Sequence, residues 1–136
     1  MVPGDSTDQP ATILVVDDDA SVLRVASKVL VRAGYNVLEA NGGPQALDLA
    51  DGRGGALDLL LTDVVMPGMS GRELGQELTS RYPDVRVLYM SAYTEDEVIL
   101  QGVRVAEVDF IAKPFTVQGL RTKVREVLDA PKRHTG

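Results

Sequence analysis

The feature that most constrains the fold is the regular alternation of short apolar runs with longer segments of helical spacing. Short apolar runs bounded by turn residues are typical of buried strands, and five occur here, at residues 13–16, 36–40, 58–62, 85–90 and 108–112. The run at residues 36–40 is the weakest. The first, third and fourth runs are apolar over consecutive residues, which is expected for parallel strands covered on both faces.

The segments between these runs place apolar residues on one side of a helix. The first ends at Gly34, Pro44 lies near the start of the second, Ser70 precedes the third, residues 94–103 form the fourth, and Thr116 caps the fifth. The apolar faces of the first and last helices are formed by Val22, Val25, Ala26, Val29 and Leu30, and by Leu120, Val124, Val127 and Leu128. Five strand–helix repeats predict an α/β fold, a doubly wound, five-stranded parallel sheet with helices on both faces.

The carboxyl ends of the predicted strands carry most of the reactive side chains. Sites in open parallel sheets form at these ends, and the residues there are Asp17, Asp18, Asp19, Asp63, Ser91, Ala92, Lys113 and Pro114. Three of the four ends carry charge and the fourth carries a hydroxyl. Residues distant in the sequence are therefore expected at one edge of the sheet.

This set of side chains suits phosphoryl chemistry with a divalent cation. Packed carboxylates repel one another, and Mg²⁺ relieves the repulsion by binding one or two carboxylates, water and phosphate oxygens. Lys113 can pair with Asp63 and then with a phosphoryl oxygen, while Ser91 can donate a hydrogen bond to another. An aspartate placed there can attack phosphorus. Singly, each residue also fits a plain structural role, and Asp19 is predicted to be a helix cap.

Four motifs resemble the receiver domain of two-component response regulators: VDDD at residues 16–19, TDVVMPGMSG at 62–71, MSA at 90–92 and KPF at 113–115. The resemblance covers residues 11–130, and it implies a flavodoxin-like (βα)5 receiver fold. We expect residues 1–10 to be a flexible leader and residues 131–136 a flexible tail. The implied function is to accept a phosphoryl group from a phosphohistidine. Such a domain is not an enzyme in the ordinary sense, because it catalyses only its own phosphorylation and dephosphorylation.

The resemblance implies the reactive and metal-binding positions. Asp63 would be the phosphoacceptor, and Lys113 would pair with the phosphoryl group. Mg²⁺ would be held by Asp17, Asp18 and Asp63 and by the backbone carbonyl of Val65, with Asp18 a direct ligand.

The resemblance also implies switching and access positions. Ser91 would be the switch hydroxyl and Phe110 the switch aromatic, so that phosphorylation changes the face around the fourth helix and fifth strand. Ala92 would leave room for the phosphoryl group, and Pro114 would follow a cis peptide bond. Val65 and Tyr93 would influence the access of hydrolytic water. Neither carries an acid or amide that could orient this water, so we predict a moderately long-lived phosphoryl-aspartate.

Composition and charge limit the partners. The net charge of −6 argues against a general nucleic-acid binder, which needs a basic face. No apolar run reaches the roughly 20 residues needed to cross a bilayer, and we expect a cytoplasmic chain. The expected partner is a sensor histidine kinase or a histidine phosphotransfer protein, and a homodimer is left open. The amino-acid sequence at residues 59–71 and 87–94 resembles that of receivers at the C-terminus of hybrid sensor histidine kinases. The chain is therefore either a stand-alone protein or a fragment of a hybrid kinase, and both hypotheses are kept.

A phosphatase of the haloacid dehalogenase type is the alternative hypothesis. Asp17, Asp19 and Ser21 form an Asp-x-Asp-x-Ser pattern similar to that family's nucleophile motif, and Asp17 would then be the nucleophile of a Mg²⁺-dependent reaction. That family also needs an acidic pair after a later strand, and residues 90–93 and 111–113 supply none. The phosphorylated residue discriminates the two hypotheses, since it is Asp63 in one and Asp17 in the other.

Overall fold

The computed structural model describes residues 10–92 and 109–130. They form five strands, β2 (Thr12–Val16), β3 (Asn36–Ala40), β4 (Leu59–Asp63), β5 (Arg86–Ser91) and β6 (Asp109–Ala112), and four helices, α1 (Ala20–Arg32), α2 (Gly43–Gly52), α3 (Gly71–Arg81) and α5 (Val117–Asp129). The helix predicted at residues 94–103 lies outside the described residues.

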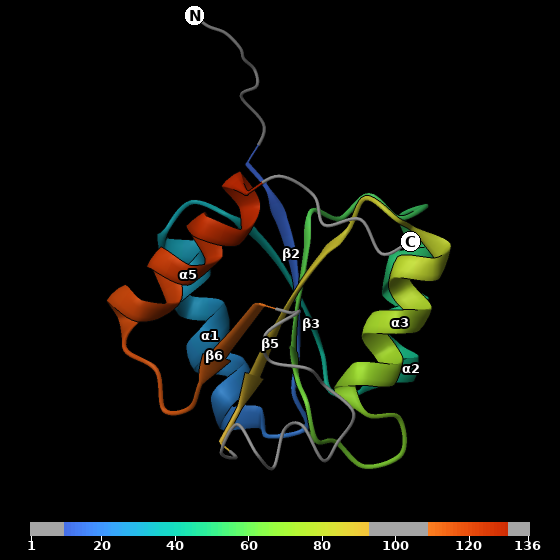
Figure 1. Ribbon diagram of the computed structural model, residues 1–136, viewed down its shortest axis with the longest axis horizontal. Helices are drawn as coiled ribbons and strands as arrows, with labels where there is room; N and C mark the ends of the chain where they lie inside the picture. Colours follow the sequence, from blue (N-terminus) through green and yellow to red (C-terminus); the bar gives the residue numbers. More distant parts are fainter. Residues whose placement is uncertain (1–9, 93–108, 131–136) are drawn as a thin grey trace, which may run out of the picture.

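All five strands are parallel, in the order β3-β2-β4-β5-β6. Figure 1 shows α1 and α5 on one face of this sheet and α2 and α3 on the other. The predicted α/β fold is therefore confirmed, and the strand order is that of flavodoxin-like sheets.

Two apolar cores lie on the two faces of the sheet because side chains alternate along each strand. Leu59 and Leu61 pack with α1 and α5, while Leu60 packs with α2 and α3. All five residues of β2 and β4 are buried, which agrees with the prediction of strands covered on both faces. The central strands are thus held rigidly, and their carboxyl ends are fixed relative to each other.

Helix α1 begins and ends as its sequence predicts, but its buried side differs from the prediction. The Asp19 side chain caps it by accepting hydrogen bonds from two backbone N–H groups, and Gly34 follows its end with φ of 101°. Val25, placed on the apolar face by the sequence, is 53% exposed. The buried stripe is centred further round the helix, where it includes the polar Ser27 and excludes Val25.

Side-chain hydrogen bonds also cap α3 and α5, whereas α2 begins after Gly42 without a side-chain cap. Ser70 caps α3, where it forms a capping box with Glu73, and Thr116 caps α5. The Arg86 guanidinium donates hydrogen bonds to the carbonyls of Leu128 (2.8 Å) and Ala130 (2.6 Å) at the end of α5. Among the described residues, no helix is long and apolar enough to span a membrane.

Candidate functional site

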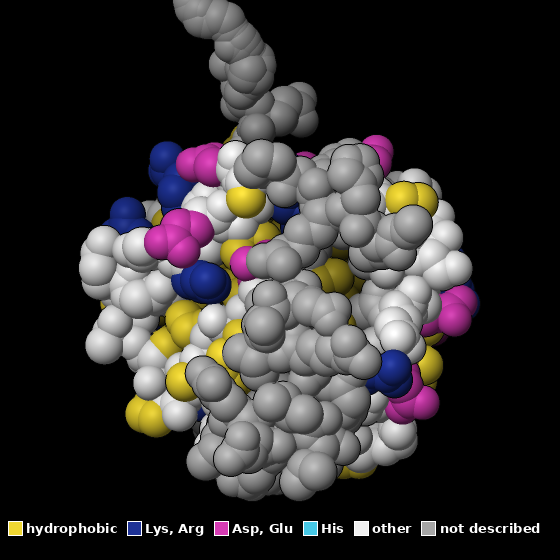
Figure 2. All heavy atoms as spheres, in the orientation of Figure 1, with side chains coloured by type: hydrophobic (Ala, Val, Ile, Leu, Met, Phe, Trp, Pro, Cys, Tyr) yellow, Lys and Arg dark blue, Asp and Glu magenta, His cyan; other side chains and the backbone are white. Residues whose placement is uncertain are grey.

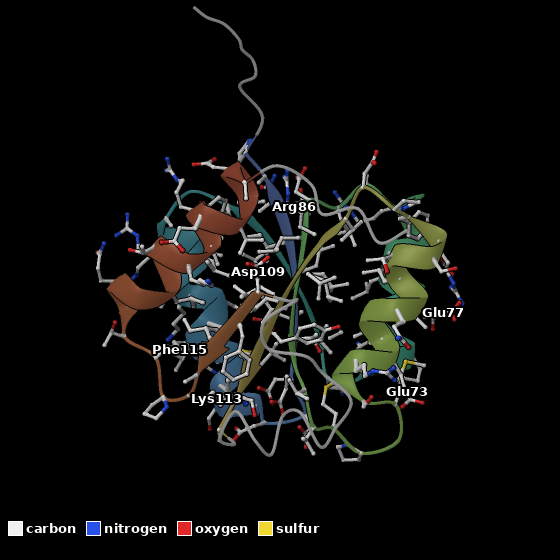
Figure 3. All side chains as sticks on the ribbon, in the orientation of Figure 1. Glu73, Glu77, Arg86, Asp109, Lys113 and Phe115 are labelled. Carbon is white, nitrogen blue, oxygen red and sulfur yellow. The ribbon has the colours of Figure 1, made fainter. Side chains whose placement is uncertain are left out.

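The carboxyl ends of four neighbouring strands meet at one edge of the sheet. The register sets Asp63 beside Met90, and Ser91 beside Ala112, so the ends of β4, β5 and β6 are level. Asp17 and Asp18 follow β2, and Lys113 follows β6. Figure 3 shows Lys113 at this end, with Arg86 at the opposite end of the sheet. The structure thus brings together Asp17, Asp18, Asp63, Ser91 and Lys113, which the sequence analysis predicted to meet at this edge from distant segments.

Three carboxylates form a compact, partly buried cluster. One carboxylate oxygen from each of Asp17, Asp18 and Asp63 lies within 4.8 Å of the others. Asp17 is 1% exposed and Asp63 is 7% exposed, whereas Asp18 is exposed. Burial raises the pKa of Asp63 to about 6; Lys113 opposes this shift, and the charges of Asp17 and Asp18 add to it.

A hard divalent cation fits this cluster. Mg²⁺ prefers oxygen ligands and keeps several waters, so one or two carboxylates with an open side suffice. Asp18 provides that open side, because its side chain faces solvent. Asp17 and Asp63 are buried, so little solvent stabilises their negative charge, and a cation would take over that role. The pKa of Asp63 is raised mainly by burial and further by the negative charges of Asp17 and Asp18, and a bound cation would oppose both effects.

Lys113 is the cation of the described site, and its shorter contact is with Asp17. Its Nζ donates a hydrogen bond to Asp17 Oδ2 at 2.7 Å and lies 3.3 Å from Asp63 Oδ1. Sequence reasoning expected the Asp63 contact and missed the stronger one with Asp17. The other Asp17 oxygen, Oδ1, accepts a hydrogen bond from the Asp19 N–H at 2.8 Å. Asp17 is therefore fixed on both sides and holds the lysine next to the phosphoacceptor candidate.

The charge of Lys113 is stabilised where it lies. Burial lowers the pKa of the ammonium group, but the hydrogen bond to Asp17 and the negative charges of Asp63 and Asp17 outweigh burial, and the pKa is raised overall. Lys113 therefore remains protonated at neutral pH and available to an anionic group.

The loop after Asp63 is held by close backbone packing at Gly71. The Gly71 N–H donates a hydrogen bond to the Val64 carbonyl at 2.8 Å. A Cβ at Gly71 would lie 1.9 Å from the Asp63 carbonyl oxygen, so only glycine permits this approach. Met66 is buried in the core on the α2 and α3 face, and Gly68 turns the chain with φ of 76°. The loop that carries Val65 is thus fixed relative to Asp63.

The switch candidates lie on β5 and β6. Ser91 is fully buried, and its carbonyl accepts a hydrogen bond from the Lys113 N–H at 2.8 Å. Phe110 is half-buried and packs in a small apolar cluster with Tyr89. The Lys113–Pro114 peptide bond, which the resemblance implied to be cis, is cis. Ala92 is exposed, and Tyr93 lies outside the described residues.

Known proteins match this chain over most of its length. Residues 13–125 match the response regulator receiver domain family. The sensor kinase CckA of Brucella abortus is 37% identical over 119 residues, which are 88% of this chain and 13% of that protein. A cyclic di-GMP phosphodiesterase of Thermotoga maritima is 33% identical over 86% of this chain and 31% of that protein. The chain thus spans less than a third of either relative.

Solved structures match the fold. The chemotaxis protein CheY4 of Vibrio cholerae has a TM-score of 0.76 and 31% identity, covering 87% of this chain and 98% of that one. The receiver domain of the hybrid histidine kinase CckA has a TM-score of 0.74 and 33% identity, covering 88% of this chain and all of that one. With the family match, these similarities establish that the chain belongs to the response regulator receiver domain family of two-component systems.

Proposed function

We propose that this chain accepts a phosphoryl group from a phosphohistidine onto Asp63 in a Mg²⁺-dependent reaction. The observation that carries the proposal is the buried carboxylate cluster with Lys113 against it, at the carboxyl ends of the central strands. Asp63 lies next to Lys113 and the candidate metal ligands, as Asp17 does, but Asp17 has both carboxylate oxygens engaged in hydrogen bonds.

The transfer forms one bond and breaks one bond. An Asp63 carboxylate oxygen attacks phosphorus as the bond from phosphorus to the donor imidazole nitrogen breaks, and the imidazole leaves neutral once its nitrogen is protonated. When bound by Asp17, Asp18, Asp63 and the Val65 carbonyl, Mg²⁺ would neutralise charge on the phosphoryl oxygens.

Two side chains of the chain itself stabilise the same charge. The Lys113 ammonium, 3.3 Å from Asp63, would donate to a phosphoryl oxygen through one of its three N–H groups, while another keeps the hydrogen bond to Asp17. The Ser91 hydroxyl would donate to another oxygen. We propose that Ser91 moves toward the phosphoryl group to make this hydrogen bond and that Phe110 moves with it. These movements would change the conformation of the face around β6 and the segment before it.

The partner in this proposal is a sensor histidine kinase or a histidine phosphotransfer protein, as for receiver domains of this kind. The similarity to the receiver of a hybrid kinase supports it. Figure 2 shows acidic and basic side chains interspersed over α5 and α3 on the visible described surface, rather than the basic face of a nucleic-acid binder. The domain would catalyse only its own phosphorylation and dephosphorylation.

Phosphorylation by a small donor tests this function. The purified chain is incubated with acetyl phosphate and Mg²⁺, and intact mass spectrometry measures the phosphorylated fraction. We expect a mass increase of one phosphoryl group in the wild type and in Asp19→Asn, because Asn caps a helix as well as Asp does. We expect none in Asp63→Asn. Equal labelling of Asp63→Asn would overturn the proposal.

The phosphatase alternative is less compatible with the geometry. Asp17 would have to be the nucleophile, but it is 1% exposed and both of its carboxylate oxygens already accept hydrogen bonds. A substrate would have to displace Lys113 to reach it. Labelling of Asp17 in the same experiment would support that alternative.

A further inference from the structure

Position 75, inside a helix, is occupied by glycine, a residue with low helix propensity. Gly75 lies in the middle of α3 and is buried, and glycine within a helix is less stable than alanine. A Cβ at this position would lie 2.4 Å from the Tyr89 hydroxyl oxygen and 3.3 Å from Tyr89 Cζ. The residue therefore makes room for the end of the tyrosine ring, which rests directly on the helix backbone.

Tyr89 reaches α3 from the strand that ends in the site. It is two residues before Ser91 on β5, so both side chains lie on the same face of the sheet. Tyr89 is 7% exposed. It packs in a small cluster with Val64 and, at its edge, Val65 and Phe110. The ring thus contacts the residues that follow the phosphoacceptor and the switch aromatic while its hydroxyl contacts the helix.

The sheet register strengthens this connection. Tyr89 lies beside Phe110 on β6 and beside Thr62 on β4, so its position is fixed from both neighbouring strands. Burial raises the pKa of the Tyr89 phenol, and the positive charge of Arg72 on α3 acts in the opposite direction. The phenol is therefore a neutral hydroxyl at physiological pH. It contacts α3 at Gly75 and lies within the electrostatic influence of Arg72 on the same helix.

We propose that Tyr89 couples the phosphorylation site to α3, so that the contact between Tyr89 and Gly75 differs between the unphosphorylated and phosphorylated states. This inference rests on the function proposed above. Ser91 lies two residues after Tyr89 on β5, and Phe110 lies beside Tyr89 on β6. Both side chains are expected to move on phosphorylation. A close-packed side chain between them and a helix transmits displacement, because no space remains to absorb it. The surface of α3 thereby becomes a second output face, on the other side of the sheet from α5.

Reciprocity between coupled sites gives the test. If phosphorylation changes the contact, a substitution that favours the contact of one state over that of the other must alter the affinity of the site for a phosphoryl mimic. Beryllofluoride with Mg²⁺ is titrated into the wild type, Gly75→Ala, Tyr89→Leu and the double variant, with binding followed by fluorine NMR. We expect Gly75→Ala to change the apparent affinity at least about fivefold in either direction, and by less than about twofold when Tyr89→Leu is also present.

A second readout and a matched control separate coupling from loss of packing. Backbone amide signals of Leu74 and Leu78 on α3 should shift on beryllofluoride binding in the wild type and in Tyr82→Phe. Tyr82→Phe removes a tyrosine hydroxyl at the end of the same helix that is bonded to Asp51. These shifts should shrink in Tyr89→Phe, which keeps the ring and loses only the hydroxyl that touches Gly75. Tyr89→Phe also replaces Tyr89→Leu in the affinity cycle if the leucine variant does not fold.

The outcomes distinguish the two proposals. If the wild type binds beryllofluoride but Gly75→Ala alters the affinity equally with and without Tyr89, the coupling through Tyr89 is wrong and the phosphoacceptor function stands. The same conclusion follows if the amide signals of Leu74 and Leu78 do not shift when beryllofluoride saturates the wild type. If the wild type does not bind beryllofluoride with Mg²⁺ at Asp63, both proposals fail.

Discussion

Replacing Asp63 by asparagine should stabilise the metal-free protein at neutral pH, although it abolishes the proposed function. Burial raises the pKa of Asp63 from 3.8 to about 6, and each pKa unit corresponds to about 1.4 kcal/mol. Ionised Asp63 therefore lowers the free energy of unfolding by about 3 kcal/mol at neutral pH. Asparagine has nearly the same shape and no charge, so Asp63→Asn should recover most of this amount.

The pH dependence follows from the direction of the shift. Between pH 4 and pH 6 the folded protein binds more protons at Asp63 than the unfolded chain does, so the stability contributed by this group falls as pH rises through that window. The difference between Asp63→Asn and the wild type should be only about 0.5 kcal/mol at pH 4. It should reach roughly half its full size at pH 5 and its full size, about 3 kcal/mol, above pH 7.

Urea unfolding measures this difference. Far-ultraviolet circular dichroism is recorded at pH 5 and pH 8 with EDTA, for the wild type, Asp63→Asn and the control Asp19→Asn. Saturating Mg²⁺ at pH 8 should shrink the advantage of Asp63→Asn, because the cation stabilises the wild-type carboxylates. A destabilised Asp63→Asn at pH 8, or an advantage that does not change between pH 5 and pH 8, would refute the electrostatic account of the site.

Three further predictions concern other residues. Ser27→Ala should stabilise the protein by about 1 kcal/mol in urea unfolding, because the buried Ser27 hydroxyl has no hydrogen-bond partner within residues 10–92 and 109–130; a loss of stability would contradict this. Arg86→Ala should destabilise by about 1–3 kcal/mol, since its guanidinium bonds two carbonyls at the end of α5, while alanine at the exposed Arg125 serves as the control with little change. The phosphorylated chain should lose its label slowly in Mg²⁺ buffer, because Val65 and Tyr93 carry no acid or amide; loss within seconds would refute this.

The position of the site could be predicted because it depends on topology. Once the sequence indicated parallel strands, the rule that sites form at their carboxyl ends placed Asp63 and Lys113 together across 50 residues of sequence. The helix caps Asp19, Ser70 and Thr116 were predictable for a similar reason, since each acts on its own helix.

Features that depend on side-chain packing could not be predicted in this way. The preference of Lys113 for Asp17 over Asp63 reflects a difference between 2.7 and 3.3 Å, which no spacing rule specifies. The exposure of Val25 depends on how α1 is rotated on the sheet, and apolar spacing fixed that rotation only approximately. Gly75 gave a local signal, a glycine inside a helix, but its explanation required the position of Tyr89.

The most direct test of the central claim is the identity of the phosphorylated residue. The chain is phosphorylated by a phosphohistidine donor in Mg²⁺, reduced with borohydride to convert an acyl phosphate to homoserine, and sequenced by tandem mass spectrometry. We expect homoserine at position 63 alone, and no conversion when EDTA replaces Mg²⁺. Homoserine at position 17 or 18, or a label that forms without a divalent cation, would contradict it.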